Sequence, residues 1–519
     1  MTTVELPAAG PGVPRARQML ERAAWAARAF ARYDHAGVMR IARAAADVAE
    51  AKAAHYAEWA VRETGFGVVE HKTLKNRLCS RGIIDAYAGH DYVTPRVDAE
   101  RKILEVPRPA GVVLALTPST NPVSTVYFKI LLALLTRNVV VLSPHPFAKE
   151  CCADAARTLG EAAVAAGAPD GVVQVIEEPS IPLIDALMTD ERTDVILATG
   201  GVPVVRAAYS SGNPAIGVGP GNVPVLVDAT ADLRRAAEKL VASKSFDNSI
   251  LCTNESVLVV EESVADRFTS ELERSGAHLL APDERDRVRD TVFPGGRFDT
   301  GMVGLDAATV AGKAGVRVPS RTRILLAPFD LVVDEEPLAH EKLCPVLGMV
   351  RVPGAARGIR AAVAVLRIGG AGHSAVVHST DPQTVLDYAA AVRVLRVTVN
   401  EGGSTGSAGF GTNLAPSMTI GTGFVGRSSL GENLEPKHLV NWTRVAYSTD
   451  ASEVMPAFDR LEPWETPRGP VPPYPVASNL AVGATTPVAS SAAGRPDHGE
   501  LREELRRLIV EELSTIIRG

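Results

Sequence analysis

The sequence is poor in aromatic residues, in net charge and in long hydrophobic runs. Aromatic residues make up 5% of the chain and the net charge is −6 at pH 7, so no basic field is expected that would gather nucleic acid or anionic lipid. The most apolar stretch, ILLALLTRNVVVL, is interrupted by Thr136, Arg137 and Asn138 and is too short to span a bilayer. The opening residues show no basic start followed by an apolar run, so no secretory leader is expected. These absences favour a soluble globular protein, and 519 residues are enough for two or three domains.

Cysteine is also scarce and shows no paired spacing. The cysteines form no CxxC motif and no His/Cys cluster at zinc-ligand spacing, so no metal site is predicted. An odd number of cysteines favours free thiols in a reducing cytosol. The cysteines are Cys79, Cys151, Cys152, Cys252 and Cys344.

Alternating helix and strand patterns dominate the chain. Residues 15–90 repeat apolar positions every three to four residues, which predicts helices. Short Val/Ile/Leu runs such as GVVLALTP, NVVVLSP, TDVILATG and NVPVLVD then alternate with helical segments, which indicates a parallel sheet covered on both faces. A second set of runs, including SVLVVEE, RILLAPF and VLRVTVN, predicts a second α/β domain.

The composition changes near residue 464. Residues 464–497 are rich in Pro, Ala, Ser, Gly and Thr, which predicts an extended or disordered linker. Residues 498–519 carry one apolar stripe at helical spacing, opposite a face of Arg and Glu, with Glu512 inside the stripe. The stripe consists of Leu501, Leu505, Leu508, Ile509, Leu513 and Ile516. This pattern predicts an amphipathic helix, and so short a helix is expected to order only when it is bound.

Cys252 lies in the segment FDNSILCTNE. A lone cysteine is more often an inert small hydrophobe. Here Asn248, Ser249, Thr253 and Asn254 surround it with polar groups, and a thiolate that attacks a carbonyl needs a partly polar, accessible setting. Cys252 is therefore a candidate nucleophile.

The Cys252 segment resembles the catalytic-cysteine segment of the CoA-acylating branch of the aldehyde dehydrogenase superfamily. It is similar to the aldehyde dehydrogenase half of bifunctional aldehyde/alcohol dehydrogenases and to stand-alone enzymes of bacterial microcompartments. Six further blocks match in the same order and extend the resemblance over roughly residues 15–450. They are TPSTNPVSTVYFK, TRNVVVLSPHPFAK, LATGGVPVVRAAYSSGNPAIGVGPGNVPV, AHEKLCPVLGM, GGAGHSAVVHS and LAPSMTIGTGFVGRSSLGENLEPKHLVN.

The resemblance implies an aldehyde dehydrogenase-like α/β fold. Residues 1–239 would form a Rossmann-like nucleotide-binding domain, completed by about 425–463, which includes a dimerising extension. Residues 240–424 would form the α/β catalytic domain with Cys252. A homodimer or homotetramer is expected. The linker and the helix 498–519 resemble the encapsulation peptides that bring enzymes into bacterial microcompartments by binding shell or core proteins. A self-association helix or a frayed tail would show the same pattern.

The same resemblance implies a mechanism. Cys252 would attack an aldehyde to give a thiohemiacetal, and hydride transfer to a nicotinamide would leave a thioester on the enzyme. Asn121 in TPSTNP, or Thr120 because the register is open, would donate a hydrogen bond to the oxyanion together with the N–H of Cys252. Asn121 is also a common turn residue before a proline.

Val218 bears on the fate of the thioester. Hydrolytic aldehyde dehydrogenases carry LELGGK where this chain has IGVGPGN, and the Glu of that motif activates water. Aligned on the glycines, that position is Val218, which cannot abstract a proton. The missing base favours transfer to a thiol, and coenzyme A is the expected thiol. A base supplied from another position remains an alternative.

His373 and Glu341 match two further functional positions of the family. His373 in GAGHSAVVH would transfer a proton near Cys252 or the CoA thiol, and it is equally compatible with a satisfied core histidine. Glu341 in HEKLCP would bind the nicotinamide ribose, or be a structural carboxylate. Cys344 is expected to serve packing only.

The dinucleotide site is expected at strand ends that lead into helices, since no GxGxxG fingerprint follows a strand. We assign to it Gly219 in the glycine-rich loop and Glu341, together with residues of the VLSPHP and ILATGG segments. The latter are Ser143, Pro144 and His145, and Thr199, Gly200 and Gly201. Hydrolytic relatives carry a lysine close to the VLSPHP position that this chain lacks, and no partner for a 2′-phosphate is evident, which favours NAD over NADP.

The sequence thus predicts an acylating aldehyde dehydrogenase that converts a short-chain aldehyde to its acyl-CoA with NAD and coenzyme A. It would work in the bacterial cytoplasm as microcompartment cargo, without nucleic-acid or membrane partners. The alternatives are a hydrolytic enzyme that releases a free acid and a catalytically weak microcompartment scaffold. The sequence does not rank acetaldehyde, propionaldehyde or polar short aldehydes.

Overall fold

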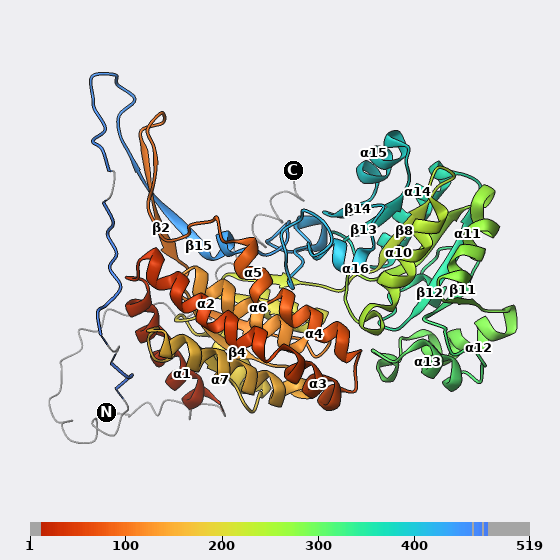
Figure 1. Ribbon diagram of the computed structural model, residues 1–519, viewed down its shortest axis with the longest axis horizontal. Helices are drawn as coiled ribbons and strands as arrows, with labels where there is room; N and C mark the ends of the chain where they lie inside the picture. The colour runs from red at the N-terminus through yellow and green to blue at the C-terminus, as the bar shows by residue number, and fades with distance from the viewer. Residues whose placement is uncertain (1–11, 459–460, 470–471, 476–519) are drawn as a thin grey trace, which may run out of the picture. The chain divides into compact units, whose positions relative to one another are not determined.

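The computed structural model describes residues 12–458, 461–469 and 472–475 (Figure 1). The chain divides into a compact unit, Met1–Tyr474, and a second unit, Pro475–Gly519. The predicted amphipathic helix 498–519 therefore lies outside the described residues. Within them, no helix combines the length and the apolar character that crossing a bilayer requires.

A five-stranded parallel sheet forms the first part of the compact unit (Figure 1). Its order is β5-β4-β3-β6-β7. Its strands are β3 (Val112–Leu116), β4 (Val139–Ser143), β5 (Val173–Val175), β6 (Val195–Thr199) and β7 (Ala215–Val218). Every residue of β3 and β4 is buried, as expected for parallel strands that are covered on both faces.

Nine helices accompany this sheet within the described residues. All residues of α6 (Pro122–Leu135) are buried, so this apolar helix lies inside the domain and not at its surface. The other eight are α1 (Val13–Phe30), α2 (His35–Ala51), α3 (Ala53–Thr64), α4 (Val69–Leu78), α5 (Arg81–Ala86), α7 (Lys149–Ala165), α8 (Ile181–Thr189) and α9 (Val202–Ser210). The first five confirm the helical prediction for residues 15–90.

A seven-stranded parallel sheet follows, in the order β10-β11-β12-β9-β8-β13-β14. Its strands are β8 (Val223–Val227), β9 (Glu255–Glu261), β10 (Ala277–Leu279), β11 (Ile324–Pro328), β12 (Val346–Val352), β13 (Ala375–His378) and β14 (Val397–Val399). Successive residues of β8 point to opposite faces of this sheet. Leu226 packs in the hydrophobic core that includes α12, α13 and α14, and Val225 packs in the core that includes α10 and α11. The helices are α10 (Leu233–Ser245), α11 (Glu262–Arg274), α12 (Pro282–Val292), α13 (Ala307–Lys313), α14 (Ala355–Ile368), α15 (Pro382–Ala391) and α16 (Gly403–Gly406).

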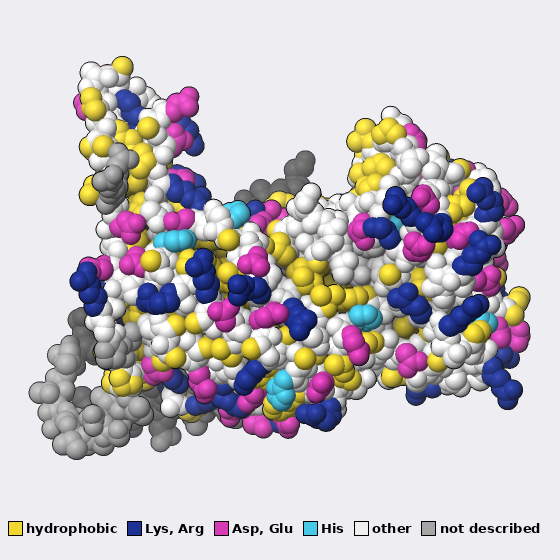
Figure 2. All heavy atoms as spheres, viewed as in Figure 1, with side chains coloured by type: hydrophobic (Ala, Val, Ile, Leu, Met, Phe, Trp, Pro, Cys, Tyr) yellow, Lys and Arg dark blue, Asp and Glu magenta, His cyan; other side chains and the backbone are white. Residues whose placement is uncertain are grey.

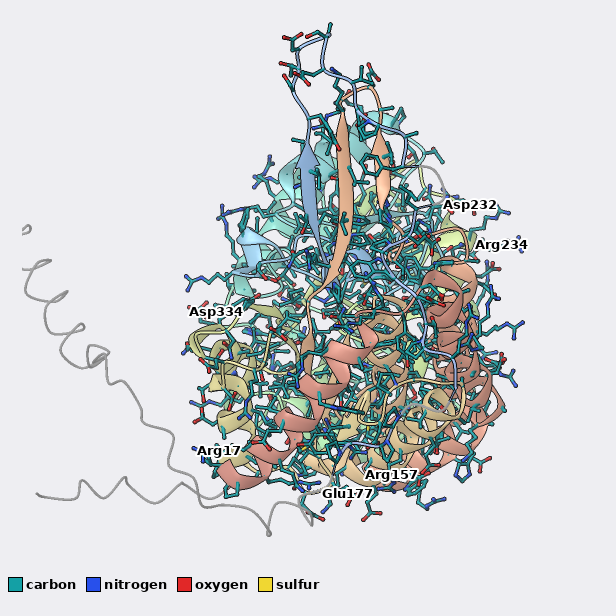
Figure 3. All side chains as sticks on the ribbon, turned by 90° about the vertical axis from the view of Figure 1, so that its left-hand side faces the viewer. Arg17, Arg157, Glu177, Asp232, Arg234 and Asp334 are labelled. Carbon is teal, nitrogen blue, oxygen red and sulfur yellow. The ribbon has the colours of Figure 1, made fainter. Side chains whose placement is uncertain are left out.

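A small antiparallel sheet is formed by segments that lie far apart in the sequence. It contains β1 (Arg96–Asp98), β2 (Ile103–Pro109) and β15 (Val440–Ala446), and β15 pairs along the whole of β2 (Figure 3). The Arg96 guanidinium lies 4.3 Å from the centre of the Trp442 ring, which links the two edge strands across β2. The segment at about 425–463, where the dimerising extension is expected, contributes β15 to this sheet.

The structure differs from the predicted domain boundary at residue 239/240. β8 belongs to the seven-stranded sheet, and α10 packs against that sheet. The division between the two α/β parts therefore falls between Val218 and Val223. The sequence shows a strand followed by a helix, but nothing local tells which sheet the strand joins.

The start of the predicted linker also differs from a free extended segment. The Trp464 indole N–H donates a hydrogen bond to the Val93 carbonyl at 3.0 Å, and the Arg137 guanidinium lies 4.5 Å from its ring centre. Further along, the Tyr474 backbone N–H donates to Asp170 at 3.1 Å. The described part of residues 464–474 is therefore anchored to the folded body through the Trp464 ring and through the backbone and ring of Tyr474, which lies 5.7 Å from the Trp25 ring between centroids.

Candidate active site

The carboxyl ends of the five parallel strands bring the expected dinucleotide residues to one edge. Ser143 ends β4, Thr199 ends β6 and Val218 ends β7, and the Thr117 N–H after β3 donates to the Ser143 carbonyl at 3.0 Å. Thr199 and Val218 are direct partners in the β6–β7 register. Ligands of open parallel sheets bind at this edge.

Several features of this edge fit a dinucleotide. Gly201 is the N-cap residue of α9, is exposed and has no side chain to block the approach of an anion. A side chain at Gly219 would meet only open space, so there is room beside this loop. The buried Thr117 hydroxyl has no hydrogen-bond partner among the described residues. These observations are compatible with the predicted pyrophosphate and ribose contacts.

The adenosine end is expected at Ser143, Pro144 and His145. The first two are buried, and His145 is half-buried with its Nδ1 accepting a hydrogen bond from the Phe147 N–H at 3.1 Å. Burial lowers the pKa of His145, so its ring is neutral near pH 7. The nearby Lys149 ammonium is paired with Glu178 at 2.6 Å. The lysine that follows this segment is therefore paired with an exposed carboxylate.

Cys252 follows a turn whose backbone is unusual. Asp247, Asn248 and Ser249 have φ values of 50°, 52° and 64°, so three successive residues with side chains occupy the left-handed region. Within the described residues the Cys252 N–H donates no hydrogen bond to another residue. The turn therefore presents the Cys252 thiol and its N–H together.

The Cys252 side chain is partly exposed and packs against an apolar cluster of Val218, Ala408, Phe410 and Ile420. Burial, aided by the charge of the nearby Glu341, raises the pKa of its thiol to about 12. The thiol is therefore protonated near pH 7, and its attack on a carbonyl requires a base.

Gly221 connects Cys252 with Glu341. A Cβ at Gly221 would overlap the carbonyl oxygen of Cys252, so only glycine fits this position. The Gly221 N–H donates to the Glu341 carboxylate at 3.2 Å. Burial raises the pKa of Glu341 to about 8 despite that bond and the charges of Lys244 and Lys342.

His373 is fully buried beside the same glycine. Its Cε1 would lie 3.5 Å from a Cβ at Gly221, and its Nδ1 is 2.8 Å from the Ser374 hydroxyl, while Nε2 has no partner in the described residues. Burial, with the charge of Arg396, lowers the pKa of His373 to about 3. The imidazole is neutral, and if Nδ1 carries the proton, Nε2 offers a free lone pair.

Asn121 caps α6 without a side-chain hydrogen bond to the helix. Its Oδ1 instead accepts a hydrogen bond from Lys75 at 2.5 Å, and its Nδ2 donates to the Thr120 hydroxyl at 3.2 Å. An ammonium group can only donate, so the amide oxygen must face Lys75. One N–H of the Asn121 amide is left for another acceptor, as the oxyanion prediction requires.

Sequence reasoning missed Gly221 and Arg396. Arg396 is buried and donates to the His373 carbonyl at 3.1 Å and to the Gly372 carbonyl at 3.2 Å, which fixes the loop that carries the imidazole. GVGPGN signals a tight loop, but not which of its glycines meets the cysteine. Arg396, in VLRVTVN, has no local signal because its partners lie on other segments.

Cys344 was expected to serve packing only, and its side chain is fully buried.

One group of side chains in the described ranges has the spacing of metal ligands: Glu432, Glu435 and His438. The Lys437 ammonium contacts Glu432 at 3.1 Å and Glu435 at 2.7 Å, and His438 Nε2 lies 2.9 Å from Glu432. The cluster is therefore accounted for by pairing among its own charges.

On the visible faces of the molecule, basic and acidic side chains are interspersed, as with Arg157 and Glu177 (Figures 2 and 3).

Comparison with known proteins identifies the family of the chain. Residues 8–291 match the model of the aldehyde dehydrogenase family. An aldehyde-alcohol dehydrogenase of Clostridium acetobutylicum is 39% identical over 425 residues, which are 80% of this chain and 49% of that protein. An acetylating succinate-semialdehyde dehydrogenase of Clostridium kluyveri is 32% identical over 86% of this chain and 98% of its own length. The chain thus spans about half the length of the first of these relatives.

Solved structures agree as well. An acetylating aldehyde dehydrogenase of Geobacillus thermoglucosidasius superposes with a TM-score of 0.83 at 37% identity, covering 85% of this chain and 98% of that one. A propionaldehyde dehydrogenase of Rhodopseudomonas palustris, with bound CoA and an acylated cysteine, gives 0.76 at 29% identity, covering 83% and 97%. One from a fucose-utilisation microcompartment of Clostridium phytofermentans gives 0.77 at 28%, covering 84% and 98%. Together with the match of residues 8–291, these likenesses show that the chain belongs to the aldehyde dehydrogenase family.

Proposed function

We propose that this protein oxidises a short-chain aldehyde to its acyl-CoA, with NAD as hydride acceptor and coenzyme A as acyl acceptor. The observation that carries the proposal is that Cys252 packs against the apolar cluster that contains Val218. The Val218 side chain offers no base that could activate water, so a thioester on Cys252 would be protected until a thiol arrives.

The first half-reaction needs a thiolate and an oxyanion site. We assign the Cys252 proton to the neutral His373 imidazole, whose Nε2 has no hydrogen-bond partner among the described residues. The Cys252 sulfur then bonds to the aldehyde carbon, and the carbonyl oxygen accepts hydrogen bonds from the Cys252 N–H and the Asn121 amide. NAD supplies the acceptor for the hydride that leaves the thiohemiacetal carbon. Glu341 would hold the nicotinamide ribose, and Ser143, Thr199, Gly201 and Gly219 would hold the rest of the dinucleotide.

The second half-reaction returns the enzyme to its starting state. The CoA thiol loses its proton, its sulfur bonds to the thioester carbon, and the bond from that carbon to the Cys252 sulfur breaks. After the first proton has passed from His373 to solvent, His373 would take the proton of the incoming thiol and return it to the departing Cys252 sulfur, and the same two donors would stabilise the second oxyanion. The bound CoA and acylated cysteine of the R. palustris structure support this assignment.

A hydrolytic reaction is the second candidate, and Glu341 favours it. Its carboxylate is the acidic group whose charge acts on the Cys252 thiol. With a pKa raised to about 8, an ionised Glu341 is a competent base for water. Its bond to the Gly221 N–H and its expected contact with the ribose oppose this role.

The test is aldehyde-dependent NADH formation with and without CoA, with product identification. Without CoA we expect a burst of one NADH per active site followed by a stall, and with CoA we expect continuous turnover to acyl-CoA. Steady release of free acid without any thiol would overturn the acylating proposal. Cys252→Ala should abolish the burst, and a surviving burst would show that Cys252 is not the nucleophile.

We further propose that the protein is microcompartment cargo that is recruited through residues 498–519, and that it forms homodimers or homotetramers. The microcompartment origin of the C. phytofermentans relative and the apolar stripe in the sequence support the first part. The small sheet with its edge strand β15 supports the second. Deletion of residues 498–519 should remove the enzyme from the shell fraction, and retention there would contradict recruitment through this segment.

A further inference from the structure

Two lysines and an aspartate form a buried charge cluster behind the proposed active site. The side chains of Lys72, Lys75 and Asp247 are 3%, 2% and 0% exposed. Both ammonium groups contact the same oxygen of Asp247, Lys72 at 3.2 Å and Lys75 more closely. The other oxygen accepts from the Val68 N–H at 2.7 Å. Burial opposes the charge of Asp247, but the two ammonium groups outweigh it and hold the pKa of Asp247 below its ordinary value.

This cluster holds the strained turn before Cys252. Asp247 is the first of the three left-handed residues, and its own N–H donates to His71 Nδ1 at 2.9 Å. The Asn248 side chain donates to the Gly304 carbonyl at 2.8 Å. A turn with three successive left-handed residues persists only when surrounding contacts determine it. Helix α4, which carries His71, Lys72 and Lys75, supplies most of those contacts.

The same two lysines reach the segment that carries the proposed oxyanion donor. Lys75 donates to the Asn121 amide oxygen at 2.5 Å, and Lys72 donates to the Thr120 carbonyl at 3.0 Å. Lys75 therefore touches both halves of the proposed oxyanion hole. One contact is with the turn that presents the Cys252 N–H, and the other is with the side chain that presents the amide N–H.

We propose that Lys75, held by Asp247, is a positioning residue for the oxyanion hole. It orients the Asn121 amide with its oxygen inward and its N–H outward, and it fixes the distance between that amide and the Cys252 turn. The inference rests on the proposed aldehyde chemistry at Cys252. It also decides between Thr120 and Asn121 as donor in favour of Asn121, whose orientation the ammonium group dictates.

A merely structural role for Lys75 makes a different prediction. If Lys75 only supported the turn, its loss would disturb Cys252 in every reaction. If it orients Asn121, its loss would harm only reactions that form an oxyanion. Alkylation of Cys252 by iodoacetamide forms none, because the thiolate displaces iodide from a saturated carbon. Acylation by an aldehyde forms one at the carbonyl oxygen.

The experiment compares Lys75→Met, Asn121→Ala and the double variant, each as the full chain. We expect Lys75→Met to slow the NADH burst without CoA about 10- to 100-fold, because loss of one oxyanion donor costs about 100- to 1,000-fold and misorientation costs part of that. Alkylation should stay within about twofold, and KM for NAD should be unchanged. In the Asn121→Ala background, Lys75→Met should cost little more.

Lys72→Met is the matched control. Lys72 contacts Asp247 as Lys75 does, but it bonds the backbone carbonyl of Thr120 and not the Asn121 side chain. We expect it to cost less in the burst than Lys75→Met. If Lys75→Met does not fold, Lys75→Gln is read in the same way, because a glutamine can still donate but leaves the Asn121 amide free to turn over. The inference is overturned if alkylation falls in parallel with the burst or if the two substitutions are additive.

Failure of the inference is distinguishable from failure of the proposed function. The burst without CoA measures acylation of Cys252 and does not depend on which acceptor removes the acyl group. An enzyme that turns over without CoA would contradict the acylating function while leaving the burst rates of the variants interpretable. A wild-type enzyme that shows no NADH formation with any of a panel of short aldehydes would overturn both.

Discussion

Val218 and Cys252 share one apolar cluster although thirty-four residues separate them in the sequence, with Val218 at the end of β7 and Cys252 ahead of β9. The end of a strand of one sheet therefore contributes to the apolar surroundings of the nucleophile that precedes a strand of the other. The residue at position 218 should therefore influence what a thioester on Cys252 encounters.

Val218→Glu should create a hydrolytic activity. The new carboxylate would stand beside the thioester and activate water, and a positioned general base contributes about 100- to 10,000-fold in favourable geometry. Because the site is apolar and burial raises a carboxyl pKa, we expect a smaller gain of about tenfold in free-acid release without CoA, increasing with pH. The measurement is acid formation per NADH in the absence of CoA.

Val218→Gln is the matched control, since it has nearly the same shape and no basic oxygen. It should leave CoA-independent acid formation at the wild-type level. Equal hydrolysis by the Glu and Gln variants would mean that water access, and not the missing base, limits hydrolysis in the wild type.

Glu341 should make NAD binding depend on pH. Burial raises its pKa to about 8, so the group is mostly protonated below pH 8 and becomes a carboxylate above it. Hydrogen bonds from ribose hydroxyls to a carboxylate are stronger than those to a neutral acid. We therefore expect KM for NAD to fall as the pH rises through about 8.

Glu341→Gln removes the titration without removing the side-chain shape. The variant should show a KM for NAD that is flat across this pH range and about fivefold higher at the alkaline end, as expected when a charged acceptor becomes neutral. A wild-type KM that is flat through pH 8 would contradict the ribose role of Glu341.

The sequence indicated most of the fold, because continuous Val/Ile/Leu runs and helical periodicity depend only on near neighbours. Cys252, Val218 and Asn121 were accessible for a similar reason, since each stands in a distinctive local segment. Lys72 and Lys75 were not, because in VEHKTLKN two lysines three residues apart look like a solvated helix face. Their burial follows from Asp247, which lies far along the chain and comes to them only through the strained turn.

The predicted domain boundary and the predicted start of the linker were less accurate than the predicted helices and strands, for related reasons. β8 has the same residue pattern as the strands before it, and only long-range pairing with β9 and β13 places it in the seven-stranded sheet. The segment after residue 464 has the composition of a linker, yet Trp464 finds a carbonyl and a guanidinium group on the folded body.

Trp464→Ala should destabilise the folded body. It removes the hydrogen bond to Val93 and the contact with the Arg137 guanidinium, and it exposes the surface beneath the ring. For a half-buried tryptophan we expect the free energy of unfolding to fall by about 2 kcal/mol, measured by urea denaturation. Glu465→Ala, at the exposed neighbouring position, should change it by less than about 0.5 kcal/mol. Equal effects of the two substitutions would mean that the segment is not anchored through Trp464.

Two buried histidines should make the fold sensitive to mild acid. Burial lowers the pKa of His373 to about 3 and that of His378 to about 4, below the ordinary value of 6.5. Between pH 6.5 and about 4 the unfolded chain binds these protons and the folded chain does not, so stability falls as the pH falls. Each imidazole contributes a slope of up to about 1.4 kcal/mol per pH unit. Urea denaturation at pH 7, 6 and 5 measures the slope, and His378→Leu should reduce it by one imidazole's share. An unchanged slope in that variant would show that His378 is protonated in the folded state, or that other groups dominate the acid sensitivity.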